Sequence, residues 1–276
     1  KQKTAYEIRN CDWSSDVCSS DLLKGIQGQV DAYRPTTARA TSRFEAHRER
    51  GLSPLVGRSE ELEMLDRRWQ LARAGEGQVI VLVGEPGIGK SRLVHELLER
   101  VSSDAHRYRI FQCSDQHTST PLHPFIEQLR AEAGLVTGDS NAEQINKLSA
   151  LLAQHGGADD AATVVLAKLL DVAVDERLAS ISVAPEQLRG RTLELVSNLL
   201  LGSEPQRPTV TIVEDLHWCD NTSGELIGQL VDACQEANAL VVVTSRPHAM
   251  PAWSTQAHGT SLTLNRLGRS QAARLV

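Results

Sequence analysis

The sequence of 276 residues lacks the features that mark several large classes of protein. No apolar run reaches the roughly 18 residues of a membrane-spanning helix, and residues 1–22 contain no apolar stretch of the signal-peptide kind. The formal net charge is −6, which argues against a nucleic-acid interface built on bulk positive charge. We therefore expect a cytoplasmic chain that contacts neither membrane nor nucleic acid directly.

Cysteine is scarce, and its five copies show neither metal-ligand spacing nor the spacing of a disulfide framework. A reducing compartment is the simplest interpretation. The sequence also has no Cys/His cluster and no internal repeat. Hydrophobic residues make up 41% and charged residues 23%, an ordinary globular balance, so we expect one large domain or two small ones without a Cys/His-bound metal.

Residues 1–22 differ from the rest of the chain because they show neither a helical nor a strand period. Residues 1–8 and 11–22 resemble the translated index-side adapter of short-read sequencing libraries, and the gap between them fits an index. We interpret this segment as a disordered artefact and exclude it from the fold. Residues 23–50 are mostly polar and predict a linker. The lack of an initial Met and the stop at Val276 lead us to expect a fragment of a longer protein.

The segment of residues 78–101 predicts a nucleotide site. An unbroken apolar run at residues 79–83 is typical of a parallel strand covered on both faces, and apolar residues at helical spacing follow from Leu93 onward. The loop between them fits the pattern G-x-x-x-x-G-K-[ST] at every fixed position. Its members are the predicted cofactor-binding residues: Gly84, Glu85, Pro86, Gly87, Ile88, Gly89, Lys90 and Ser91.

Each part of this loop has a physical role in binding phosphate. The glycines allow positive φ and a close approach of the backbone to an anion, so that N–H groups point at phosphate oxygens. The helix that starts near Lys90 adds free N–H groups and the positive end of its dipole. The Lys90 ammonium can reach the β- and γ-phosphates, and the Ser91 hydroxyl can bind Mg²⁺. We therefore expect ATP and Mg²⁺ as cofactors.

A second apolar strand, expected at residues 209–213, ends in two acids, Glu214 and Asp215. In open parallel sheets ligands bind at the carboxyl ends of the strands, where Gly84 also emerges. One acid would hold the Mg²⁺ shell, and the other would act catalytically by orienting or deprotonating the attacking water. The usual order is Asp before Glu, and the reversed order here leaves open which acid is the base.

A third strand is expected at residues 240–244, and Arg246 follows it at the same edge. A cation there can meet the γ-phosphate and report its presence, so Arg246 joins the acids as a candidate catalytic residue. A surface ion pair is the alternative for this side chain. We assign no role to His217 and Trp218, because a lone His-Trp pair is more often packing than chemistry.

The alternation of strands and helices predicts the fold class. It favours an α/β fold in which a parallel sheet lies between two layers of helices. Further strands are expected at residues 108–113 and 261–265. Helical patterns between the second and third strands predict a helical insertion. We expect Ser59 to be the N-cap of the first helix, and we assign residues 51–276 to this domain.

These motifs together resemble the AAA-type ATPase module of large bacterial signalling proteins, a P-loop NTPase of the group called STAND. The resemblance extends over about residues 53–276. It rests on PLVGR at residues 54–58, GEPGIGKSRL at 84–93, PLHPFIEQL at 121–129, VEDLHWCD at 213–220 and TSRP at 244–247.

The resemblance implies further expectations about sites and neighbouring domains. Val56, Gly57 and Arg58 would lie near adenine, which makes them candidate cofactor-binding residues. Such modules often follow a class III adenylate or guanylate cyclase domain and precede helical repeats, and residues 23–33 look like the last strands of a cyclase. The lid of the family would lie beyond Val276, so the domain is expected to be truncated before its lid.

The function implied by the resemblance is a regulatory switch that binds ATP with Mg²⁺ and hydrolyses it slowly. Its expected partners are the nucleotide and the flanking domains. The alternatives are a non-hydrolysing ATP-binding scaffold and the ATPase module of a LuxR-type transcriptional regulator. A small-molecule kinase would need an acceptor pocket that no motif names, and the acidic balance disfavours a DNA loader of the origin-recognition type.

Overall fold

The computed structural model describes residues 55–104, 106–155, 157, 159–174, 177–181, 183–202, 207–255, 259–268, 271 and 273. The segments interpreted above as an artefact (residues 1–22) and a linker (residues 23–50) lie outside the described residues. The expectations for them therefore stay predictions.

A five-stranded sheet forms the centre of the domain, in the order β2-β3-β4-β1-β5. The strands are β1 (Gln78–Val83), β2 (Arg107–Gln112), β3 (Thr209–Glu214), β4 (Ala239–Ser245) and β5 (Gly259–Thr263). All neighbouring strands pair in parallel, so their carboxyl ends share one edge of the sheet. Each of the expected strands is confirmed, with bounds that differ by one or two residues.

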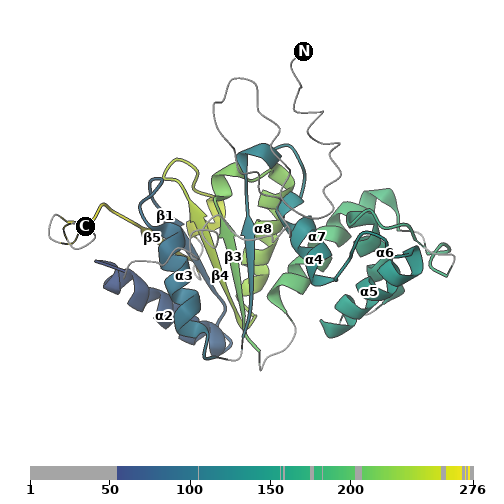
Figure 1. Ribbon diagram of the computed structural model, residues 1–276, viewed down its shortest axis with the longest axis horizontal. Coiled ribbons are helices and arrows are strands. Elements are labelled where there is room, and N and C mark those ends of the chain that lie inside the picture. The colour runs from purple at the N-terminus through teal and green to yellow at the C-terminus, as the bar shows by residue number, and fades with distance from the viewer. Residues whose placement is uncertain are drawn as a thin grey trace, which may run out of the picture. The chain divides into compact units, whose positions relative to one another are not determined.

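Helices cover both faces of this sheet, and Figure 1 shows α2 and α3 on one side and α8 on the other. The first group is α2 (Ser59–Arg73) and α3 (Lys90–Val101), and α8 spans Asn221–Cys234. The predicted helical insertion between β2 and β3 is confirmed as α4 (His123–Glu132), α5 (Asn141–Gln154), α6 (Asp160–Leu169) and α7 (Pro185–Leu201). Short 3₁₀ turns are η2 (Asp115–His117), η3 (Leu216–Trp218) and η4 (Ala252–Thr255).

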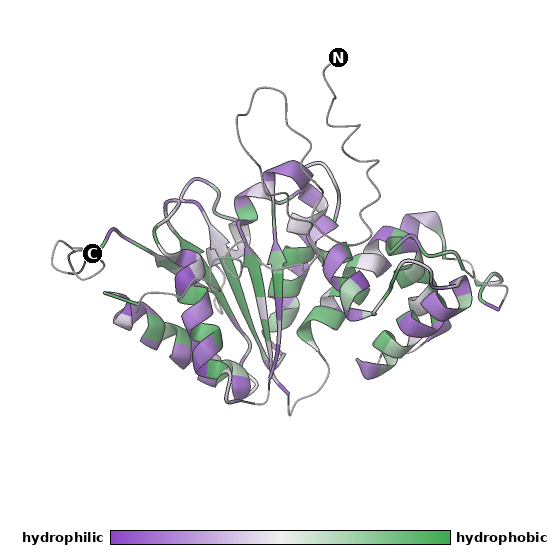
Figure 2. Ribbon diagram, viewed as in Figure 1, coloured by the Kyte–Doolittle hydropathy of each residue, from purple (hydrophilic) through white to green (hydrophobic). Residues whose placement is uncertain are grey.

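The unbroken apolar runs of the central strands have a simple cause. Ile80 and Leu82 of β1 pack with α2 and α3, whereas Val79 packs in the cluster on the opposite face. In β4, Val242 and Val243 divide between the two clusters in the same way. Because successive side chains point to opposite faces of a strand, both faces need apolar residues here. The central strands are accordingly among the most hydrophobic parts in Figure 2.

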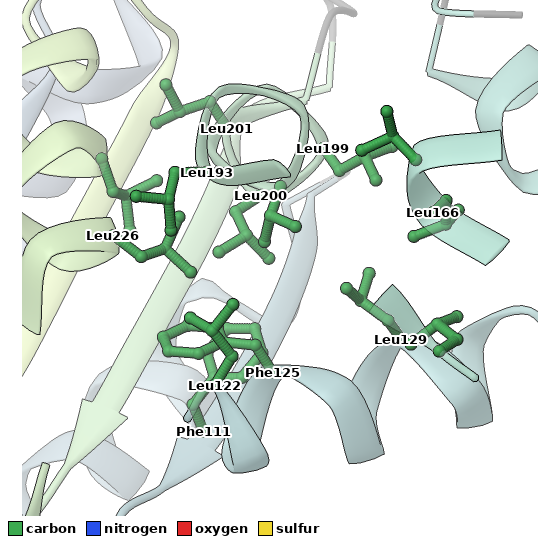
Figure 3. Packing of buried hydrophobic residues seen from close by; sticks show 14 of the residues in the cluster. Phe111, Leu122, Phe125, Leu129, Leu166, Leu193, Leu199, Leu200, Leu201 and Leu226 are labelled. Atoms are coloured by element: carbon green, nitrogen blue, oxygen red, sulfur yellow. The ribbon is translucent and has the colours of Figure 1, made fainter. Parts of the chain in front are cut away.

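The helical insertion extends the core on one face of the sheet. The rings of Phe111 from β2 and Phe125 from α4 lie 4.6 Å apart between centroids. Leu200 of α7 and Leu129 of α4 belong to the same cluster, and Figure 3 shows these side chains together. Both phenylalanines and both leucines are almost fully buried. The insertion is therefore packed against the sheet through a continuous apolar core.

A buried polar network also joins β2 to the insertion. Arg109 donates from Nε and Nη2 to the carboxylate of Glu132 at 2.9 and 2.6 Å. It donates from Nη1 to the carbonyl of Leu200 at 3.3 Å and from Nη2 to Nε2 of His155 at 3.0 Å. His155 can accept there because its Nδ1 lies 2.9 Å from the carbonyl of Leu151, an arrangement that places the ring proton on Nδ1. Every hydrogen-bonding nitrogen of Arg109 thus has a protein partner.

Helix α2 begins differently from the prediction. Arg58 is its N-cap and provides no side-chain cap, and Ser59 is the first helical residue. The guanidinium of Arg58 bonds instead to Glu61 in the first turn at 2.8 Å, so an ion pair replaces the hydroxyl cap that we expected. Within the described residues, every helix is too short or too polar to span a lipid bilayer.

Candidate functional site

The carboxyl edge of the sheet brings the predicted motifs together. The register aligns Val83 with Ser245, and the N–H of Gly84 donates to the carbonyl of Ser245 at 3.2 Å. In the neighbouring pair, Gln112 of β2 aligns with Glu214 of β3. The glycine-rich loop, the acid pair and Arg246 therefore all begin where a strand ends, at one edge of the same sheet. This edge is where open α/β sheets bind their ligands.

The glycine-rich loop has the backbone that a phosphate cradle needs. Gly87 and Gly89 adopt φ values of +74° and +104°, and a Cβ added at either would meet no atom within 4 Å. The loop is thus open at these glycines, and its conformation strains any residue with a side chain. Helix α3 starts directly after Gly89 with no side-chain cap, which leaves the N–H groups of its first turn for an anion.

Lys90 is held against this loop. Its side chain is buried, and Nζ donates to the carbonyls of Gly84 at 2.8 Å and Glu85 at 3.1 Å. An ammonium has three donors, so one remains for a phosphate oxygen. Burial lowers the pKa of Lys90, and the negative charge of Asp215 is the strongest influence that opposes this shift.

The charges around Lys90 show which groups share the edge. Besides Asp215, its pKa is lowered by Arg246 and raised by Glu85 and Glu214. The contacts between the strand ends agree, since Gly84 donates to the carbonyl of Ser245 and Asp215 to the hydroxyl of Thr244. Lys90, the acid pair and Arg246, which are far apart in the sequence, therefore face one region. The structure brings these predicted site residues together, and their chemical roles remain predictions.

The two acids occupy different backbone environments. Glu214 is the last residue of β3 and is 4% exposed. Asp215 leaves the strand with a positive φ of 56°, and its N–H donates to the Thr244 hydroxyl at 2.9 Å. Gln112 donates from Nε2 to the Asp215 carboxylate at 3.1 Å. The sequence interpretation missed Gln112, although its place near the end of a neighbouring predicted strand was an available signal.

Arg246 lies beside the residues that received no role from the sequence. Its guanidinium carbon is 5.4 Å from the ring centroid of Trp218, which is within the range of a cation–π contact. Among the residues that the structure describes, Arg246 forms no ion pair with a carboxylate, so the alternative of a surface ion pair is not seen. The indole of Trp218 therefore holds this cation at the strand edge without neutralising its charge.

His217 is the second residue that sequence reasoning passed over. Its Nδ1 and Nε2 are both buried and have no hydrogen-bond partner in the described part of the chain. Burial lowers the pKa of this imidazole, Arg246, Lys90 and His248 lower it further, and Asp215 opposes the shift. Asp215 and Arg246 thus act on both His217 and Lys90. No sequence signal marks this burial, since it depends on the packing of three separate segments.

The residues before α2 also approach the phosphate loop. Besides its bond to Glu61, Arg58 donates to the carbonyl of Ile88 at 3.2 Å and to that of Asn265 at 2.6 Å. Val56 is buried, and Gly57 has a φ of +67°. Arg58 therefore connects the loop to the segment after β5 through protein carbonyls. The predicted contact of Val56, Gly57 and Arg58 with adenine is not tested by this geometry.

Cys113, which directly follows β2 at this edge, is not a nucleophile in this arrangement. Cys113, Cys219 and Cys234 are free thiols. A hydrogen bond with Cys219, together with burial, raises the pKa of Cys113 far above its usual range. A thiol that stays protonated is a poor nucleophile and a poor metal ligand.

The donor set at the edge suits magnesium, although only together with a nucleotide. The Ser91 hydroxyl and the carboxylates of Glu214 and Asp215 supply hard oxygen atoms, which Mg²⁺ prefers. Within the described residues, no group of three or more His, Cys, Asp and Glu side chains is arranged to hold a metal by itself. Magnesium sites commonly combine one or two carboxylates with substrate phosphates, and these residues fit that pattern.

Together, strand β1, the open glycine loop, the buried lysine and helix α3 define the site of a P-loop nucleoside triphosphatase. Residues 54–243 match the AAA ATPase domain family. The match covers more than half of the chain, and the chain belongs to this family.

A relative in the bacterium Rhizobium meliloti (strain 1021), an uncharacterized protein, is 31% identical over 249 residues. The alignment covers 90% of this chain and 24% of that protein. The chain therefore spans about a quarter of the length of this relative.

Several solved structures are similar at low identity. The ORC1 protein of Aeropyrum pernix in complex with DNA is 15% identical, with a TM-score of 0.42 over 81% of this chain and 49% of that one. Drosophila ORC bound to DNA is 12% identical, with a TM-score of 0.40 over 79% and 45%. PCH-2 of C. elegans is 9% identical, with a TM-score of 0.38 over 76% and 43%. At such low values these similarities carry no argument about ligands or partners.

Proposed function

We propose that this chain is the ATP-binding core of a regulatory switch within a larger bacterial signalling protein. The observation that carries the proposal is that the loop of Lys90, Asp215 and the segment of Arg246 meet at the carboxyl edge of one sheet, where Gly84 bonds to Ser245 and Asp215 to Thr244. Groups of these types hold a triphosphate, orient water and sense the terminal phosphate in P-loop enzymes. A cytoplasmic location agrees with ATP as the ligand.

The roles of the residues follow from their positions. The N–H groups of the loop and of the first turn of α3 bind phosphate oxygens, and Lys90 adds its third donor. Ser91 and Glu214 would hold a bound Mg²⁺, which would supply positive charge to the phosphates. Asp215 would orient the attacking water and take its proton. We assign this role to Asp215 because Gln112 holds its carboxylate in place at the edge of the sheet.

The switch would operate through the terminal phosphate. Contacts from the ends of β3 and β4 to this group exist only with a triphosphate bound, so hydrolysis removes them. The flanking domains of the longer protein, with a cyclase and helical repeats as candidates, would read this change through their packing. Slow hydrolysis suits such a device, because the lifetime of each state then sets the duration of the signal.

A non-hydrolysing scaffold is the rival proposal, and two measurements on the 276-residue chain separate them. The first is ATP affinity by calorimetry for the wild type and Lys90→Ala. We expect a loss of about 30-fold, as for a lost charge-assisted hydrogen bond. Unchanged affinity in Lys90→Ala would refute the site.

The second measurement is phosphate release with Mg²⁺ by the wild type, Glu214→Gln and Asp215→Asn. We expect slow release by the wild type and a loss of about 100-fold in Asp215→Asn, a usual contribution of a general base. Glu214→Gln should raise the Mg²⁺ concentration that release requires. ATP binding without any phosphate release would favour the scaffold over the switch.

A further inference from the structure

Both ring nitrogens of His217 are buried, although the residue as a whole is only partly buried, and packing alone does not explain this. Neither ring nitrogen has a hydrogen-bond partner among the described residues, and neither is open to solvent. A neutral imidazole carries one donor and one acceptor. Leaving such a group buried and unpaired destabilises the folded state. An apolar side chain of similar size would fill the same space without this cost.

The surroundings of the ring point to an anionic partner. The charged and titratable groups that act on His217 are Arg246, Asp215, Lys90 and His248. They come from the ends of β3 and β4, from the loop after β4 and from the start of α3. Most of these groups are cationic or can become so. The ring therefore faces the region in which the phosphate loop collects positive charge.

The polar groups near the ring bond to other partners, and none of the described ones bonds to His217. The Asp215 carboxylate accepts from Gln112 at 3.1 Å, and the Thr244 hydroxyl accepts from the N–H of Asp215 at 2.9 Å. Arg246 lies over Trp218, whose ring centroid is 5.0 Å from that of His217. The protein thus surrounds the imidazole with groups that leave its nitrogens free for a ligand.

We infer that His217 hydrogen-bonds to the terminal phosphate of a bound nucleoside triphosphate and so distinguishes triphosphate from diphosphate. The inference rests on the proposed nucleotide site and adds a residue to it. The loop N–H groups and Lys90 arise from the β1–α3 connection and hold the phosphates nearest to it. His217 arises from β3, across from this loop, and only a third phosphate extends the ligand toward β3 and β4. A diphosphate lacks the group that the imidazole would bind.

The test compares two ligands and two variants of the 276-residue chain. Affinities for ADP and for a non-hydrolysable ATP analogue are measured for the wild type, His217→Leu and His248→Leu, together with their melting temperatures. In His217→Leu we expect analogue affinity to fall about tenfold, as for a lost hydrogen bond to a charged group, while ADP affinity stays the same. Its melting temperature should not fall, because the variant removes two unpaired polar atoms.

His248→Leu is the matched control, since His248 is exposed and contributes charge at the same edge. It should leave the ratio of the two affinities unchanged. If His248→Leu lost as much affinity for the ATP analogue as His217→Leu, general charge would be responsible and the inference would be overturned. An equal loss of affinity for both ligands in His217→Leu would also overturn it. So would a lower melting temperature of His217→Leu with an unchanged ratio of the two affinities, because that result indicates a packing role. If the wild type binds neither ligand, the proposed function itself is wrong.

Discussion

The network around Arg109 and the carboxyl edge of the sheet differ in how fully their buried polar groups are hydrogen-bonded. In the network between β2 and the insertion, Arg109 finds a protein acceptor for each of its nitrogens. At the carboxyl edge, His217 has no partner for either ring nitrogen within the described residues, and Lys90 keeps one donor in reserve. Saturated polar groups stabilise a fold, whereas unsaturated ones are available to a ligand. At these two places the difference separates a structural network from groups that are available to a ligand.

The largest expected effect tests the structural side of this comparison. Arg109→Met leaves the Glu132 carboxylate without its main partner, although partial exposure of Glu132 limits the cost. We expect a loss of about 3 kcal/mol in the free energy of unfolding, measured by urea titration. ATP affinity should not change at concentrations where the variant is folded.

Arg189→Met is the matched control for Arg109→Met. Arg189 pairs with Glu225 on the surface, where both side chains are well exposed. Exposed pairs contribute about 0–1 kcal/mol, so this variant should be nearly as stable as the wild type. Similar losses in the two variants would remove the distinction between a saturated buried network and an ordinary surface pair.

The second prediction tests the functional side of the comparison. Gln112→Leu removes the amide that holds the Asp215 carboxylate, so the carboxylate can rotate away from the attacking water. We expect phosphate release to fall about tenfold, the equivalent of one hydrogen bond of about 1.4 kcal/mol. The melting temperature and the ATP affinity should stay close to those of the wild type. Faster release would contradict this view and would mean that Gln112 restrains the acid.

The third prediction concerns a helix cap within the insertion. The Asp159 side chain accepts from the N–H of Ala162 and caps α6. Asp159→Ala should cost about 1 kcal/mol, as for other N-caps, without any effect on phosphate release. Asp160→Ala is the control, since Asp160 lies in the first turn without being the cap, and it should cost only a few tenths of a kcal/mol.

The smallest expected effect is a change in how the stability of the folded chain depends on pH. His123 stacks on His117 at a centroid distance of 3.6 Å, and burial, with a smaller effect of His117, lowers the pKa of His123. The unfolded chain, with an ordinary pKa near 6.5, therefore binds a proton more readily than the folded chain. Stability should fall as the pH drops below about 6.5.

The variant His123→Gln removes the contribution of His123 to the pH dependence of stability. Other groups with lowered pKa values, such as His217, are still present in the variant. We expect the decrease in melting temperature between about pH 7.5 and pH 5.5 to be smaller in the variant than in the wild type. An identical decrease would mean that the stacked pair does not resist protonation.

Much of the fold could be predicted because the local hydrophobic pattern of this chain agrees with its tertiary structure. The apolar run before Gly84 identified a strand covered on both faces, and the two core clusters confirm it. The error at Ser59 arose because an ion pair of Arg58 with Glu61 replaced a hydroxyl cap, a choice that local propensity does not contain. For the candidate site, the phosphate loop and the acid pair were predicted, and Gln112 and His217 were missed. The roles of Val56, Gly57 and Arg58 remain predictions.

The sequence by itself determined that a glycine-rich loop follows a buried strand and opens a helix, because spacing and residue type are local properties. It also determined that acids and a cation end two further strands. Only the tertiary structure decided which strands are neighbours, in the order β2-β3-β4-β1-β5, because strand pairing joins segments that lie far apart in the chain. It alone left the His217 nitrogens buried without a partner, because burial is the sum of contacts from segments that lie far apart in the chain.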